Sequence, residues 1–139
     1  LGTLLLSTFF ASAARAQCAT VHGSECPHAT SAPHCVTPPQ IGTVFSVQCP
    51  ACAHDRRSFV VVGAPLHSPI VIGAPVTCHH QLCNLSCSPL ALLLANHVRI
   101  HIPNDHHLIG LSLCIQCGCV DPTVPCLELS LATGATITS

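Results

Sequence analysis

Residues 58–76, SFVVVGAPLHSPIVIGAPV, hold two copies of one short pattern. Each copy is a run rich in β-branched residues, residues 58–62 in the first and residues 70–72 in the second, that ends in Gly-Ala-Pro. β-Branched residues favour strands, and proline is tolerated where a strand ends because no ladder donor is needed there. Two copies are too few for a solenoid. The stretch therefore predicts two successive strands, each ended by a turn.

Further strands are predicted on both sides of this stretch. Residues 98–102 (VRIHI) alternate apolar with polar side chains, which indicates a half-buried strand. We also expect strands over residues 108–113 and 127–131, and a turn at residues 104–107 (NDHH). Only residues 90–95 (LALLLA) favour one or two helical turns. The predicted fold class is a small all-β, disulfide-rich domain with irregular loops and at most one short helix.

The chain divides into three expected regions. Residues 1–16 contain a short apolar run and an Ala-Arg-Ala cleavage pattern, which we interpret as a fragment of a signal peptide. Residues 17–48 are rich in Pro, Ser, Thr and His, which predicts a loop-rich N-terminal segment. Residues 49–139 are expected to form the disulfide-stapled β domain.

Cysteine content is the strongest signal in the chain. There are twelve cysteines among 139 residues, a share and an even number that are typical of a disulfide scaffold. Such thiols pair in oxidising compartments, so we expect a secreted protein in the extracellular space or cell wall. The disulfide candidates are Cys18, Cys26, Cys35, Cys49, Cys52, Cys78, Cys83, Cys87, Cys114, Cys117, Cys119 and Cys126.

Charge is scarce. Charged residues make up 6% of the chain against 49% hydrophobic residues, and the formal net charge is −1. A nucleic-acid partner is not expected, because the basic footprint that binds phosphates is missing. No segment predicts a transmembrane span. Lys, Met, Trp and Tyr are all absent. This bias fits either a specialised structural protein or a sequence that is partly out of frame or contains errors, which would have no specific function.

Several short motifs could carry chemistry. The Cys49–Cys52 spacing, with His54 nearby, resembles half of a zinc site, and so does the Cys114–Cys117 spacing. The second spacing also occurs in redox pairs. In a secreted chain the same cysteines are better interpreted as disulfides, so we expect no metal and no cofactor. No acid–base or nucleophile pattern predicts an enzyme. Asn84-Leu85-Ser86 is a candidate glycosylation sequon.

Residues 35–126 resemble a fungal class I hydrophobin. The likeness rests on PPQIGTVFSVQC, which ends at Cys49, on the apolar stretch of residues 59–76, and on the Cys-Ser-Pro-Leu that begins at Cys87. The resemblance implies a secreted protein that self-assembles at an air–water or cell-wall surface.

The resemblance also assigns places to eight cysteines. Cys35 is its first single cysteine, Cys49 and Cys52 stand for the first doublet, and Cys87 and Cys114 are the middle singles. Cys117 and Cys119 stand for the second doublet, and Cys126 is the last. The chain departs from the family in having no Cys-Cys doublet and in carrying Cys18, Cys26, Cys78 and Cys83 in addition.

The expected function is therefore that of a surface-active structural coat protein. So little charge cannot cover the surface, and exposed apolar patches mark interaction sites. The residues expected at the interface are Val60, Val61, Val62, Ile70, Val71 and Ile72. The alternative is a monomeric secreted cysteine-rich binding protein, such as a lipid carrier or an effector. A weaker likeness of SPLALLLAN, residues 88–96, to plant lipid-transfer-like proteins favours that alternative.

Overall fold

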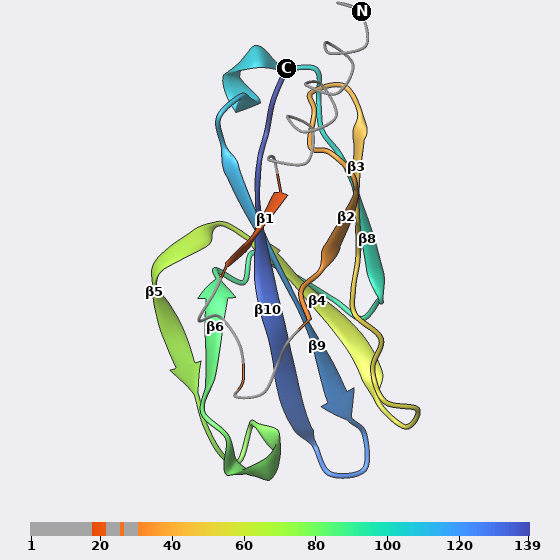
Figure 1. Ribbon diagram of the computed structural model, residues 1–139, viewed down its shortest axis with the longest axis vertical. Helices are drawn as coiled ribbons and strands as arrows, with labels where there is room; N and C mark the ends of the chain where they lie inside the picture. The colour runs from red at the N-terminus through yellow and green to blue at the C-terminus, as the bar shows by residue number, and fades with distance from the viewer. Residues whose placement is uncertain (1–17, 22–25, 27–30) are drawn as a thin grey trace, which may run out of the picture.

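A computed structural model describes residues 18–21, 26 and 31–139. Its main element is a five-stranded antiparallel sheet with the strand order β1-β10-β9-β4-β7. These strands are β1 (Cys18–Val21), β10 (Cys126–Thr136), β9 (Ser112–Asp121), β4 (Arg57–Gly63) and β7 (Ala91–Leu93). The long β9–β10 hairpin runs along most of the molecule (Figure 1).

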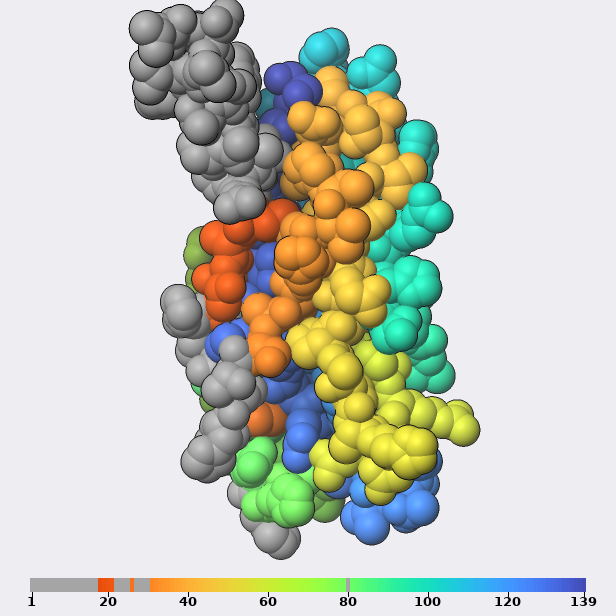
Figure 2. All heavy atoms as spheres, turned by 45° about the vertical axis from the view of Figure 1, so that its right-hand side comes forward, coloured from red at the N-terminus to blue at the C-terminus, as the bar shows by residue number. Residues whose placement is uncertain are grey.

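Two smaller sheets cover the two faces of this central sheet. A three-stranded sheet, β2 (His34–Thr37), β3 (Val44–Gln48) and β8 (His97–His101), packs on one face. The hairpin of β5 (Pro65–Ile72) and β6 (Cys83–Cys87) packs on the other. Figure 1 shows these two layers on opposite sides of β9 and β10, and Figure 2 shows the segment from β2 to the loop before β4 lying in front of the central sheet.

This three-layer arrangement explains the uninterrupted apolar run of β4. Phe59 and Val61 belong to the core beneath β5 and β6, with Leu85 of β6. Val60 belongs to the opposite core, with Phe45 of β3. A strand buried on both faces is apolar at every position instead of at alternate ones. The sequence of residues 59–62 is therefore that of an inner strand.

The two faces of β9 carry disulfides to different layers. Cys114 pairs with Cys87 of β6, whereas Cys117 pairs with Cys49, directly after β3. Side chains three positions apart on a strand point to opposite faces, so these two cysteines must bond in opposite directions. Cys119 lies on the same face as Cys117 and pairs with Cys52.

Three further disulfides join the segments around the central sheet. Cys18 of β1 pairs with Cys35 of β2, Cys26 pairs with Cys83 of β6, and Cys78 pairs with Cys126 at the start of β10. All twelve cysteines are therefore paired. The prediction of a small, disulfide-rich all-β domain is confirmed.

A buried amide connects three strands. The Gln116 side chain is fully buried, and its Oε1 accepts a hydrogen bond from the Ser86 backbone N–H at 3.0 Å. Its Nε2 donates to the backbone carbonyl oxygens of Asn84 and Ser130, both at 3.0 Å. The register of β10 shifts between Leu129 and Ala132, so Ser130 lies at this irregularity. One β9 side chain thus satisfies backbone groups of both β6 and β10.

Several local predictions can be compared with the strands. Strands do cover residues 58–62, 70–72 and 98–101, and β10 includes residues 127–131. Residues 17–48 contribute β1, β2 and β3 between their loops. The turn at residues 104–107 is present: Asp105 precedes the short 3-10 helix η2 (His106–Leu108), and its carboxylate accepts from the His107 N–H at 2.9 Å.

Two predictions are wrong. The helix expected over residues 90–95 is instead the edge strand β7, because pairing with β4 outweighs the modest helix preference of a few leucines. The strand expected over residues 108–113 begins only at Ser112, because Leu108 belongs to η2. The described residues also contain η1 (Cys78–His80), another short helix of the 3-10 type.

The repeated Gly-Ala-Pro motif gives a matched test of the packing. A Cβ at Gly63 would overlap the Ser88 carbonyl oxygen, because Ser88 and Ala64 exchange two hydrogen bonds there. A Cβ at Gly73 would meet only the flexible end of Leu82 at 3.1 Å. We expect Gly63→Ala to lower the free energy of unfolding by at least about 2 kcal/mol and Gly73→Ala to change it by less than about 1 kcal/mol. Urea unfolding followed by circular dichroism measures both, and equal effects would contradict this packing.

Gln116 gives a second test. Gln116→Leu removes the partners of one backbone N–H and two carbonyls in the interior, so we expect a loss of about 2–4 kcal/mol of unfolding free energy. Gln48→Leu is the control, because the Gln48 amide is exposed and donates to the Asn96 carbonyl oxygen at the surface. The cost of this change should be below about 1 kcal/mol. Denaturant unfolding measures the free energy of unfolding of both variants. If Gln116→Leu is as stable as Gln48→Leu, the Gln116 amide does not stabilise the interior as described.

Candidate functional site

The first run of expected interface residues is not at the surface. Val60 is 0% exposed and Val61 4% exposed, and Val62 is half-buried against the core under β3 and β8. The expectation that these three residues form an interface is wrong for Val60 and Val61. The physical reason is that β4 is an inner strand with a packed layer on each face.

The second run lies at the surface. Val71 is 59% exposed and Ile70 48% exposed, whereas Ile72 is half-buried. β5 belongs to a two-stranded sheet at the outside of the molecule, so one of its faces has no layer above it among the described residues. The two copies of the repeat therefore have opposite environments.

A leucine-rich edge was missed as a candidate interface. Leu90 and Leu94 are each 79% exposed, and Leu92 and Leu93 are also exposed. The signal was present as the run LALLLA, but a helix was expected there, and no interface was assigned to it. As an edge strand, β7 cannot turn all of its leucines inward. We call the exposed side chains of Leu90, Leu92, Leu93 and Leu94 the apolar rim.

A groove lies between the β5–β6 hairpin and the central sheet. Its volume is about 250 Å³, and every side chain that lines it is apolar. Phe59 and Val61 of β4 contribute from the central sheet, and Leu85 of β6 from the opposite layer. Leu92 and Leu94 of the apolar rim also line it. We call this the apolar groove.

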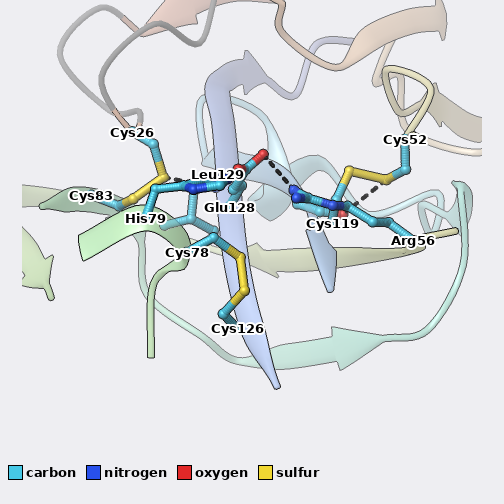
Figure 3. A network of polar contacts seen from close by, with 11 residues as sticks. Cys26, Cys52, Arg56, Cys78, His79, Cys83, Cys119, Cys126, Glu128 and Leu129 are labelled. Carbon is cyan, nitrogen blue, oxygen red and sulfur yellow. Dashed lines mark hydrogen bonds and ion pairs between the residues drawn. A yellow bond between two sulfur atoms is a disulfide. The ribbon is translucent and has the colours of Figure 1, made fainter. Parts of the chain in front are cut away.

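A second hollow has one lining residue, Leu94, in common with the apolar groove. Its volume is about 600 Å³, and its lining includes His54, Arg56 and Arg57. We call it the basic hollow. Arg56 forms an ion pair with Glu128 of β10 at 2.9 Å, and Figure 3 shows this pair between the Cys52–Cys119 and Cys78–Cys126 disulfides. The hydrogen bond to Glu128 and its negative charge raise the pKa of Arg56 above the usual arginine value.

Two aspartates have lowered pKa values, and both cap turns. The pKa of Asp105 is lowered mainly by the hydrogen bond from the His107 N–H. The pKa of Asp121 is lowered mainly by hydrogen bonds from Thr123, in the turn between β9 and β10. A carboxyl whose pKa is depressed stabilises the fold above its unfolded pKa, and this contribution is lost as the pH falls through the folded value. These groups hold turns, and neither lines the groove or the hollow.

The candidate glycosylation residue Asn84 is half-buried on β6. Its backbone carbonyl accepts from Gln116, and the neighbouring cysteines, Cys83 and Cys87, are both fully buried and disulfide-bonded. The sequon therefore lies within the layered part of the fold. Whether Asn84 carries a glycan stays a prediction.

The metal and redox interpretations required different cysteine partners. Cys49, Cys52, Cys114 and Cys117 each contribute their sulfur to a disulfide with a distant cysteine. A disulfide sulfur is not the thiolate that binds zinc, and Cys114 and Cys117 are not bonded to each other. Within the described part of the chain, no three His, Cys, Asp or Glu side chains gather to hold a metal ion.

Comparison of this chain with family models, curated proteins and solved structures gives no match. The proposed leader, residues 1–16, lies outside the described residues. In the part of the chain that is described, no helix has the length and apolar character needed to cross a bilayer. The six disulfides are those of a protein that folds in an oxidising environment.

The two copies of the repeat can be tested against each other. Val61→Asp places a carboxylate in the core, and we expect it to cost more than about 3 kcal/mol of unfolding free energy or to prevent folding. Val71→Asp places the same group on the exposed face of β5, where a change of less than about 1 kcal/mol is expected. Circular dichroism and thermal unfolding measure both. If Val61→Asp folds as well as Val71→Asp, the assignment of the first run to the core is wrong.

Proposed function

We propose that this chain is a secreted, surface-active structural protein that coats boundaries between water and apolar phases. The observation that carries the proposal is the apolar rim, in which Leu90 and Leu94 are 79% exposed and Leu92 65% exposed. Large exposed apolar patches on folded proteins mark surfaces that are buried against something else. An air–water or cell-wall surface would bury this rim without a specific partner.

The fold separates the rim from the core. The core is built from other residues, such as Val60 and Phe59, and six disulfides hold the layers around it. If the core side chains themselves had to contact the apolar phase, the protein would unfold when it adsorbs. Disulfides limit the expansion of the chain, so the protein can expose leucines and still keep its fold during adsorption.

Self-association is the second part of the proposal. β7 is the last strand of the central sheet, and an edge strand presents backbone donors and acceptors to another chain. Its three residues carry no charge and lie beside Leu90 and Leu94. Two molecules could therefore join at β7 through both strand pairing and leucine contacts. The resemblance of residues 35–126 to class I hydrophobins implies assembly at interfaces of the same kind.

The proposal predicts surface activity that depends on the rim. The wild type should lower the surface tension of water at micromolar concentration. Leu90→Asp with Leu93→Asp should weaken this effect strongly, because a carboxylate is costly to remove from water. These two leucines do not line the apolar groove, so the variant leaves the groove intact. A pendant-drop tensiometer measures the effect.

The control carries the same two charges elsewhere. Val36→Asp with Val124→Asp changes residues that are 61% and 63% exposed, on β2 and in the β9–β10 turn. It should keep the surface activity of the wild type, while circular dichroism shows that both double variants are folded. A wild type without surface activity would contradict the proposal, and so would equal losses in the two variants.

A further inference from the structure

The lining of the apolar groove suits only apolar ligand groups. Its exposed lining surface contains no polar atoms, and its walls include Phe59, Val61, Ile72 and Leu85. A polar part of a ligand placed there would lose its hydrogen bonds to water without replacement, which is unfavourable. A hydrocarbon chain has no such groups to satisfy. The groove is therefore suited to an aliphatic chain, whose burial is favourable in proportion to the apolar area removed from water.

The size of the groove limits the length of that chain. A water molecule in the liquid occupies about 30 Å³, and a methylene group is of similar size. The groove volume of about 250 Å³ therefore holds a single chain of about eight carbons at that volume per carbon. A two-chain lipid would not fit into it.

An arginine lies next to a residue that lines the groove. Arg57 is the register partner of Val120, which lines the groove, and Phe59 lines it two residues along β4. Because side chains on a strand alternate, Arg57 and Phe59 are on the same face of the central sheet. Arg57 is exposed, lines the basic hollow, and has no ion-pair partner among the described residues. The guanidinium of its neighbour Arg56 is instead paired with the Glu128 carboxylate.

We propose that the apolar groove and Arg57 together bind a monomeric single-chain fatty acid. The aliphatic chain lies in the groove, and the carboxylate meets the Arg57 guanidinium near Leu94, the residue that lines both the groove and the basic hollow. Arginine suits this role because its planar group can donate two parallel hydrogen bonds to a carboxylate. The inference does not depend on the surface-active function. That function is tested at Leu90 and Leu93, and neither residue lines the groove.

The chain offers a direct reporter for this site. It contains no Trp and no Tyr, so Leu92→Trp introduces a single tryptophan at the edge of the groove, at a position that is 65% exposed. Titration with sodium decanoate, below the concentration at which it forms micelles, should shift the tryptophan emission to the blue and reach saturation. Leu111→Trp, at a 51% exposed position outside the groove, is the control and should show no saturable shift.

Charge reversal then tests the carboxylate contact. In the Leu92→Trp protein, Arg57→Glu should weaken decanoate binding by roughly tenfold or more, the range expected for losing a hydrogen-bonded charge. Arg99→Glu, which makes the same charge change on β8, should alter it by less than about twofold, because the charge of an exposed side chain outside the site is screened by salt. Decanol, which has the chain without the charge, should bind equally to the Arg57→Glu and unchanged proteins.

Three results would overturn the proposal. These are equal emission shifts in the Leu92→Trp and Leu111→Trp proteins, equal affinities after Arg57→Glu and Arg99→Glu, or no saturable response to decanoate. If circular dichroism shows that Arg57→Glu does not fold, Arg57→Gln replaces it, since it removes the charge without reversing it. Weaker decanoate binding with unchanged decanol binding would then support the site, and unchanged decanoate binding would overturn it.

Discussion

The structure depends on the covalent anchoring of one strand to the layers on both of its faces. β9 bonds through Cys114 to β6 on one side, and through Cys117 and Cys119 to the segment after β3 on the other. Between them, Gln116 satisfies backbone groups of β6 and β10. Because adjacent positions on a strand face opposite ways, this short run of residues can hold three layers together.

Local patterns were sufficient for part of this fold. The β-branched runs, the alternation at residues 98–102 and the Asn-Asp turn depend on neighbours in sequence, and they could be predicted. β9 could not, because both of its faces are buried and its segment CIQCGC has no alternation of polar and apolar residues. Disulfide partners were also beyond prediction, since twelve cysteines allow thousands of pairings. The fold class could be predicted from composition, but the pairing of the cysteines could not.

The candidate site shows the same limit. The two copies of the repeat have nearly the same sequence, yet Val61 is in the core and Val71 is at the surface. Their difference comes from the position of the strand: β4 is an inner strand of the central sheet, and β5 belongs to an outer hairpin. The leucines of residues 90–94 suggested a helix, and pairing with β4 made them an exposed edge. The same arrangement leaves the apolar groove and Arg57 next to each other, although nothing in the spacing of those residues predicted it.

Disulfide mapping tests the anchoring of β9 most directly. The unreduced protein is cleaved between Cys114 and Cys117, and the linked peptides are identified by mass spectrometry. The account predicts that Cys114 remains attached to the peptide of Cys87, and Cys117 to the peptide of Cys49. A bond between Cys114 and Cys117, or both cysteines bonded to the same layer, would contradict it, because neither is compatible with a strand that anchors a layer on each face.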